Sequence, residues 1–238
     1  MKILALECSA SPCSAAILED GKIISSAFVN VKITHSQTLM MLVEGVLKSS
    51  LTGIDDIGGV AVGIGPGSFT GIRIGISAVK GLASPEKLPC VGVSTLEAIA
   101  ENLSDKNALI CAVMDAKCNQ VYNAVFNAEN GEIARICEDR AISIENLKKE
   151  LNSLSQKYEK SVIIAGDGSD VFYPAVLEDK NIIKADEKHI YQNAVGVAFC
   201  AAKCFIKNET VLPEALNPVY LRLPQAEREL KLRKEQEK

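Results

Sequence analysis

The sequence repeats one order of strands and helices, and the two copies are offset by roughly 100 residues. In each half, three apolar runs lead into a helical stretch and then into a fourth apolar run that ends in glycine and serine. Asp20-Gly21 and Asn130-Gly131 separate the second and third runs, and both dipeptides favour tight hairpins. The predicted strands span 3–6, 14–18, 23–31 and 60–67 in the first half and 108–114, 121–126, 133–136 and 162–168 in the second, with helices over 36–51, 72–83, 143–154 and 194–206. The sequence therefore predicts an α/β protein built from a duplicated β-β-β-α-β-α unit with mixed sheets.

This duplicated order resembles the two-lobed fold that is shared by actin, the sugar kinases and Hsp70, known as the ASKHA fold. We expect the first lobe to comprise residues 1–104 and the second lobe residues 105–224, because polar residues cluster between elements at 103–107. Charges of both signs alternate after Gln225, so residues 225–238 are predicted to form a charged, frayed tail.

The composition disfavours several classes of protein. A net charge of −4 and an aromatic content of 5% argue against tight, unaided binding of nucleic acid. The eight cysteines form no Cys-x-x-Cys pair, and the two histidines, His35 and His189, lie far apart, so neither a disulfide scaffold nor a metal site is well supported. We find no secretory signal and no apolar stretch of the ~20 residues that cross a bilayer. We therefore expect a cytoplasmic protein with reduced thiols, without a metal and without membrane contact.

Four glycines follow an apolar run and precede a helical stretch in the segment Gly63–Arg73. Such a junction lets backbone N–H groups converge on an anion, or lets two segments pack very closely. The segment lacks the Gly-Lys-Ser/Thr of a Walker A loop, and a proline interrupts the Gly-x-Gly-x-x-Gly spacing of dinucleotide-binding proteins. The sequence leaves both interpretations open. The candidate anion- or nucleotide-binding residues are Glu7, Ser9, Gly65, Gly67 and Ser68.

Catalytic constellations are not visible in the sequence, and we predict no catalytic residue. A second phosphate-binding hairpin would fall at Met114–Asn119, which contains no glycine to allow a close backbone approach. Ser68 does not sit in a Gly-x-Ser-x-Gly motif, and no order of histidine and aspartate completes a triad. An active ATPase or kinase that uses the cleft between the lobes, with Glu7 holding a magnesium-bound water, stays open as the alternative.

Two helical stretches, 36–51 and 71–83, carry more apolar surface than one lobe should need. Polar side chains in the second stretch are confined to Arg73, Ser77 and Lys80. A helix that is apolar on nearly all sides is either buried within its domain or covered by a partner, and the pattern alone allows both. The candidate partner-interface residues are His35, Leu39, Met40, Leu42, Val43, Val46, Leu47, Ile72, Arg73, Gly75, Ile76 and Val79.

Four parts of the chain carry a family resemblance: the N-terminal strand, the segment Gly63–Ala83, Gly92-Val93-Ser94-Thr95-Leu96 and the ending Pro218-Val219-Tyr220-Leu221-Arg222. Through them the whole chain resembles the TsaB family, the dimerisation subunits of the bacterial machinery that makes threonylcarbamoyladenosine in tRNA. One departure is Glu7-Cys8-Ser9, where the family more often has Asp-Thr-Ser or Asp-Thr-Ala.

The resemblance implies a non-catalytic scaffold. It implies that the two apolar helices pair with the catalytic subunit TsaD, or with a second copy of the chain, and that a small ATPase, TsaE, joins the complex. TsaD binds its metal through a His-x-x-x-His helix, and our alignment places those two ligands at Thr95 and Ile99, which supply no imidazole nitrogen. We therefore expect ATP and metal on partner subunits, no cofactor on this chain alone, and contact with tRNA only through the complex. The acidic net charge disfavours a third option, a tRNA-binding adaptor.

Overall fold

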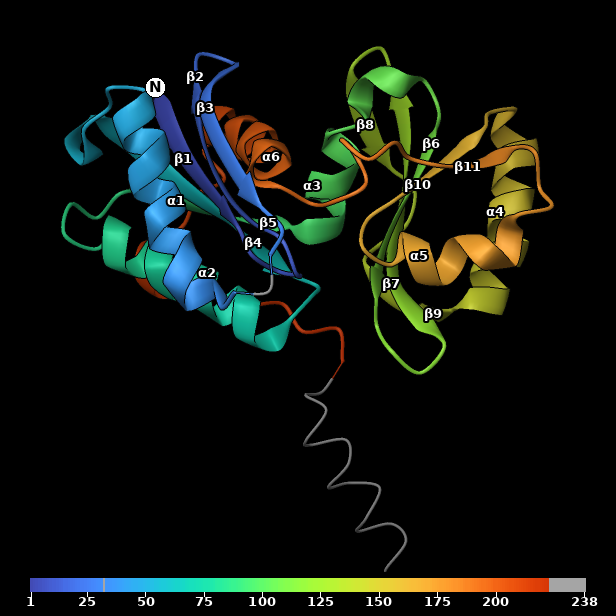
Figure 1. Cartoon of the computed structure of the whole chain (residues 1–238). Coiled ribbons are helices and arrows are strands. Elements are labelled where there is room, and N and C mark those ends of the chain that lie inside the picture. Colours follow the sequence, from blue (N-terminus) through green and yellow to red (C-terminus); the bar gives the residue numbers. More distant parts are fainter. Residues whose placement is uncertain (32, 223–238) are drawn as a thin grey trace, which may run out of the picture.

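The computed structural model describes residues 1–31 and 33–222, which form two α/β lobes joined through helix α3 (Thr95–Glu101) (Figure 1). The first lobe contains β1 (Lys2–Glu7), β2 (Cys13–Glu19), β3 (Lys22–Val29), α1 (His35–Ser49), β4 (Ile57–Gly65), α2 (Phe69–Ala83) and β5 (Cys90–Ser94). The second contains β6 (Leu109–Asp115), β7 (Gln120–Glu129), β8 (Glu132–Arg135), β9 (Arg140–Ser143), α4 (Ile144–Tyr158), β10 (Val162–Ala165), α5 (Ser169–Phe172) and β11 (Ile182–Lys184), and α6 (Ala194–Ile206) follows. Short 3-10 turns span Ile54–Asp56, Ser104–Lys106, Tyr173–Val176 and Pro213–Ala215. The predicted duplication of strands and helices is confirmed.

Both sheets are mixed, as the duplicated pattern predicts. The first sheet has the order β3-β2-β1-β4-β5, with β1 antiparallel to β2 and parallel to β4. The second has the order β11-β10-β6-β7-β8, and β9 also pairs with β7. Strand β6 takes the place that β1 has in the first sheet, because it is antiparallel to β7 and parallel to β10. The two lobes are therefore built on the same central strand arrangement.

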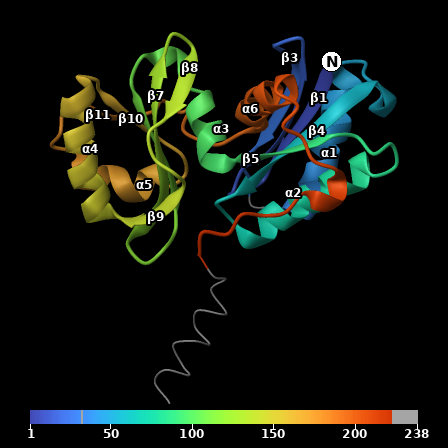
Figure 2. The same ribbon diagram turned by 180° about the vertical axis from the view of Figure 1, so that it is seen from behind.

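Helices cover both faces of the first sheet, which explains why β1 is buried along almost its whole length (Figures 1 and 2). Helices α1 and α2 pack on one face, where Leu39 and Val79 join the core formed by Leu4 and Val60. Helix α6 covers the other face with small side chains such as Ala198, which let it approach the sheet closely. Within the described ranges, no helix is long and apolar enough to cross a bilayer.

The last described part of the chain belongs to the first lobe, which corrects the predicted second lobe of 105–224. Helix α6 packs on β1 and β2 of the first sheet. Val211 exchanges two backbone hydrogen bonds with Cys90 in β5, and the Val219 N–H donates to the Ile64 carbonyl at 2.9 Å. In the sequence the repeat can be recognised only as far as about residue 168. The segment after it was therefore assigned to the second lobe only because it follows that lobe in the chain. The predicted frayed tail, 225–238, lies outside the described residues.

Helix α3 joins the lobes because its two sides are buried in different cores. Ala98 packs in the core beneath α6, whereas Leu96 and Ile99 pack with Ile110 of β6. Ion pairs reinforce this side of the molecule, since Arg135 in β8 bonds Glu97 in α3 at 2.8 Å. The lobes are thus firmly connected at α3.

Candidate functional site

The predicted glycine segment forms the junction between β4 and α2. Ser68 directly precedes the helix, and its Oγ accepts a hydrogen bond from the Gly71 N–H at 3.2 Å. Gly65 has a φ of +118°, in the region that favours glycine. The strand–glycine–helix junction that the sequence predicts is confirmed.

The protein's own backbone occupies the space beside these glycines. The Ser9 carbonyl accepts a hydrogen bond from the Ser68 N–H at 2.6 Å. A Cβ added to Gly67 would meet that same carbonyl, and a Cβ added to Gly71 would meet the carbonyl of Cys8. Because these carbonyls lie where an anion would be held, the geometry favours close packing over anion binding at this turn.

Glu7 lies beneath the glycine segment and is 1% exposed. Its Oε1 accepts the Ser9 N–H at 2.6 Å, while Oε2 lies against Gly63 and has no hydrogen-bond partner among the described residues. Burial raises the pKa of this carboxyl above its ordinary value. The structure therefore corrects the inclusion of Glu7 among the candidate anion- or nucleotide-binding residues, because its carboxyl is closed off from solvent and lies against Gly63. It also corrects that of Gly65, whose free space is taken by the Val219 carbonyl.

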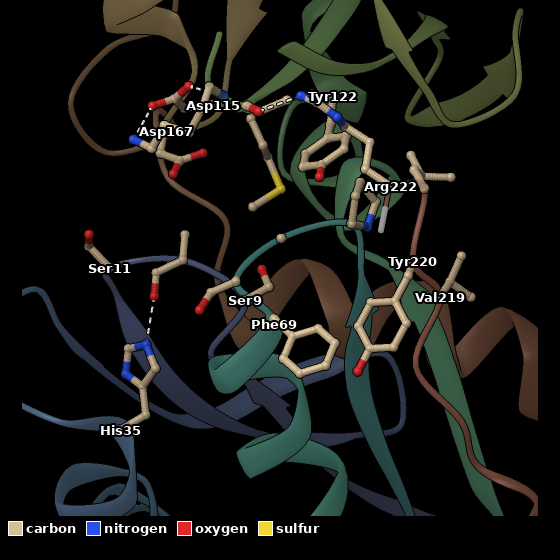
Figure 3. Close-up of a pocket in the computed structure, with 18 residues that line it drawn as sticks. Ser9, Ser11, His35, Phe69, Asp115, Tyr122, Asp167, Val219, Tyr220 and Arg222 are labelled. Atoms are coloured by element: carbon tan, nitrogen blue, oxygen red, sulfur yellow. Dashed lines mark hydrogen bonds and ion pairs between the residues drawn. The ribbon is translucent and has the colours of Figure 1, made fainter. Parts of the chain in front are cut away.

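The other three candidates, Ser9, Gly67 and Ser68, line a cavity of about 560 Å³ between the lobes (Figure 3). Its walls are the β1–β2 loop, the start of α2, the β6–β7 turn and residues 219–222. In Figure 3, Asp115 and Asp167 lie on one side of this cavity, and Ser9 lies on the opposite side. Lys117 forms an ion pair with Asp115, which balances part of this negative charge.

Asp167 makes stability depend on pH. Burial, and then the charge of Asp115, raises its pKa from the ordinary 3.8 to about 6. The native state therefore binds this proton more tightly than the unfolded state, so the contribution to stability is complete below pH 3.8 and is lost as the pH rises through about 6. Asp167→Asn should remove that loss, which raises the stability at pH 7 relative to pH 4 by up to about 3 kcal/mol.

Urea unfolding of the wild type and of Asp167→Asn between pH 4 and pH 8 measures this effect. Asp186→Asn is a suitable control, because His189 lowers the pKa of the exposed Asp186 carboxyl below its ordinary 3.8, so that this group titrates below the measured range and the curve should run parallel to that of the wild type. Parallel curves of stability against pH for the wild type and Asp167→Asn would show that the carboxyl is not perturbed.

The residues that the structure describes contain no group of three or more histidine, cysteine, aspartate or glutamate side chains that could hold a metal ion. Thr95 and Ile99, the positions aligned with metal ligands, are fully buried in α3 and do not line the cavity. That no cofactor is bound by this chain alone stays a prediction.

The predicted partner interface divides into a buried part and an exposed part. Seven of its residues lie in the protomer's own core, where they pack toward the first sheet: Leu39, Val43, Val46, Ile72, Gly75, Ile76 and Val79. Their assignment to a partner interface is corrected, because the most apolar stripe of each helix faces its own sheet. His35, Met40, Leu42, Leu47 and Arg73 are exposed or partly exposed, and they stay predicted interface residues.

An apolar groove of about 610 Å³ runs beside the exposed face of α1. We call it the α1 groove. It is lined by Met40, Val43, Glu44, Leu47, Lys48, Leu51, Thr52, Gly53, Ile54 and Leu82. Leu51 is 92% exposed, and Met40 is 46% exposed. The two charged residues in the lining, Glu44 and Lys48, pair with each other. The groove is therefore an exposed apolar surface without an unbalanced charge.

The prediction did not assign a role to the ending Val219–Arg222, which forms part of the cavity wall. Tyr220 stacks on Phe69 with 4.8 Å between the ring centroids, and the Arg222 guanidinium donates to the Ala116 carbonyl at 2.6 Å. The sequence did mark this ending, because it is among the motifs that carry the family resemblance. Its role could not be predicted, because its contacts are to residues more than 100 positions away in the chain.

Comparison with known proteins decides the family. A family model described as "TsaD: tRNA N6-adenosine threonylcarbamoyltransferase" matches residues 29–229. The tRNA threonylcarbamoyladenosine biosynthesis protein TsaB of Escherichia coli (strain K12) is 32% identical over 225 residues, which cover 93% of this chain and 95% of that protein. The chain belongs to the TsaB family.

Other comparisons place this TsaB-family chain among two-lobed proteins. YeaZ from Pseudomonas aeruginosa superposes with a TM-score of 0.78 at 25% identity, covering 92% of this chain and 99% of that chain. Component A of the (R)-2-hydroxyglutaryl-CoA dehydratase of Acidaminococcus fermentans has a TM-score of 0.52 at 14% identity, over 85% of this chain and 98% of that chain, which shows the fold alone. The predicted ASKHA fold is thereby confirmed. The tRNA N6-adenosine threonylcarbamoyltransferase of Geobacter sp. (strain M21) is 34% identical over 113 residues, which cover 41% of this chain and 33% of that enzyme.

Proposed function

We propose that this TsaB-family chain acts in the biosynthesis of threonylcarbamoyladenosine, on the adenosine next to the tRNA anticodon, as a non-catalytic scaffold that binds and activates a TsaD-like catalytic subunit. The observation that carries the proposal is the α1 groove. Leu51, Ile54 and Met40 expose apolar surface in it, and the charges of Glu44 and Lys48 are already paired. Burial of this surface would supply the binding free energy, at roughly 25 cal/mol per Å² before the entropy lost on association.

A TsaD-like subunit fits this surface because it shares the fold. The transferase family matches residues 29–229, a range that includes all of α1 and α2. Two proteins of the same fold can place equivalent faces against each other about an approximate two-fold axis, as two identical chains do. Met40 and the exposed Met41 suit such a face, since the flexible methionine side chain adapts to more than one partner. We therefore infer that the same face forms a homodimer when the catalytic subunit is absent.

The absence of catalysis in this chain is supported by the two turns that face the cavity. Carbonyls of Cys8 and Ser9 fill the space at the start of α2, and the β6–β7 turn contains no glycine to admit a phosphate. We infer that ATP and metal bind to the partner subunits, that a TsaE-like ATPase joins the complex, and that tRNA is contacted through the assembly. Such a complex would work in the cytoplasm, where tRNA is modified.

Analytical ultracentrifugation of the chain with a TsaD-like subunit tests the proposal. We expect one heterodimer species, and we expect threonylcarbamoyl transfer to tRNA only when both proteins are present. Failure to co-sediment, or transfer by this chain without the catalytic subunit, would contradict the scaffold.

An active ATPase or kinase is the second candidate, and the cavity between the lobes is the observation that favours it. Titration of the isolated chain with magnesium and ATP in a calorimeter separates the two candidates. The scaffold predicts no binding heat, whereas the ATPase predicts micromolar binding that depends on magnesium.

A further inference from the structure

We propose that Asn217–Arg222 form a latch that fastens the two lobes to each other across the cavity and fixes the angle between them. The latch segment leaves the first lobe beside α2 and reaches the β6–β7 turn of the second lobe (Figures 2 and 3). The proposal concerns the isolated chain and does not depend on the proposed function.

Backbone contacts anchor the latch segment to the first lobe. The Val219 N–H donates to the carbonyl of Ile64 at 2.9 Å. The Val219 carbonyl lies 2.5 Å from where a Cβ of Gly65 would be, so this backbone approach requires glycine at position 65. The segment is therefore seated directly against the end of β4.

A three-residue stack holds the latch segment from the side of α2. The Tyr220 ring lies on the Phe69 ring, with 4.8 Å between centroids and an angle of 25° between their planes. The Arg73 guanidinium lies 3.7 Å from the centroid of Phe69, and its Nε donates to the Tyr220 hydroxyl at 2.8 Å. The contact combines a flat aromatic surface with a charged hydrogen bond, so it fixes the orientation of Tyr220 as well as its position.

The latch segment is attached to the second lobe through Arg222, two residues after Tyr220. The Arg222 guanidinium donates to the Ala116 carbonyl at 2.6 Å, which Figure 3 marks next to Asp115. Ala116 is buried, and its own N–H is bonded to the Gln120 carbonyl at 3.2 Å, so the turn offers a fixed carbonyl. The segment between Tyr220 and Arg222 is too short to reach this carbonyl if the lobes move apart by more than a few ångströms.

The latch and α3 hold the lobes together at two separate places, so the latch can restrict rotation of the lobes about α3. At α3, the lobes are held by core packing and by ion pairs such as Arg135 with Glu97. A hinge at one side leaves rotation free unless the far side is also attached. Arg222 supplies such an attachment across the cavity, so its loss should let the lobes rotate about α3.

The distance between the lobes, measured by double electron–electron resonance, tests the latch. Spin labels are placed at the exposed positions 37 in α1 and 153 in α4, with the exposed Cys118 replaced by serine. We expect Arg222→Ala to broaden the distance distribution and to shift it toward longer distances. Tyr220→Ala should do the same by removing the stack on Phe69 and the hydrogen bond from Arg73 in the first lobe. Arg222→Lys keeps a charged donor for the Ala116 carbonyl and should stay close to the wild type.

Arg140→Ala is the matched control, because that guanidinium bonds Asn123 and Glu150 within the second lobe. It should lower the melting temperature without changing the distance between the lobes, which separates a latch from a general loss of stability. Hydrogen exchange gives a second readout, since the Val219 amide and residues 113–120 should exchange faster in Arg222→Ala. A distance distribution of Arg222→Ala that equals the wild type would overturn the latch. Failure of TsaD binding would not, because the measurement uses this chain alone.

Discussion

Met40→Glu is expected to weaken binding of the chain to a TsaD-like subunit by roughly 30- to 100-fold, or about 2–3 kcal/mol. Met40 lines the α1 groove and is 46% exposed, so the carboxylate stays in water in the free chain and becomes buried without a partner in the complex. The fold should be preserved, because the core side of α1 is formed by other residues such as Leu39. Sedimentation or calorimetric titration with the catalytic subunit measures the change in Kd.

Leu177→Glu is the matched control for Met40→Glu. Leu177 is an exposed apolar residue of the second lobe, 64% exposed and outside the α1 groove. We expect this variant to bind like the wild type. Equal binding by wild type and Met40→Glu would remove the groove from the interface, while equal weakening by both variants would point to a general effect of added negative charge.

Gly71→Ala is expected to destabilise the protein by about 1–3 kcal/mol, the range for inserting a methyl group into a packed interior. The added Cβ would meet the backbone carbonyl of Cys8, and a backbone group cannot move aside by rotation of a side chain. Gly81, in the same helix, has nothing within 4 Å of an added Cβ. Gly81→Ala should therefore stabilise the protein by roughly 0.5–1 kcal/mol through helix propensity alone.

Thermal and urea unfolding of the two alanine variants separates the two interpretations of the glycine segment. Opposite changes in stability support close packing of α2 on the loop after β1. If Gly71→Ala were as harmless as Gly81→Ala, the turn would have spare room, and an anion-binding role would regain support. A wild type that gains stability in inorganic phosphate, lost in Gly71→Ala, would point the same way.

The order of elements could be predicted because its signals are local. Asp20-Gly21 and Asn130-Gly131 do separate paired strands, β2 from β3 and β7 from β8. Helix α6 was also predicted with the bounds that the structure has, Ala194–Ile206. What the sequence did not reveal is that α6 returns to the first lobe, because its apolar small residues would suit either sheet.

The candidate site was harder to predict because it depends on contacts between distant segments. The carbonyls of Cys8 and Ser9 decide what the glycine segment does, and they lie about 60 residues before it. In α1, apolar residues extend around most of the helix, so periodicity alone does not say which side faces the sheet. The more regular stripe, with Leu39 and Val43, is the buried one, and the less regular side with Met40 and Leu51 forms the groove.

Hydrogen exchange of this chain with and without a TsaD-like subunit tests the proposed scaffold most directly. The account predicts slower exchange in residues 35–54, which contain α1 and most of the α1 groove, with no change in α4 at Ile144–Tyr158. Protection confined to 115–120 and 217–222 around the cavity, with α1 unchanged, would contradict it and place the partner between the lobes.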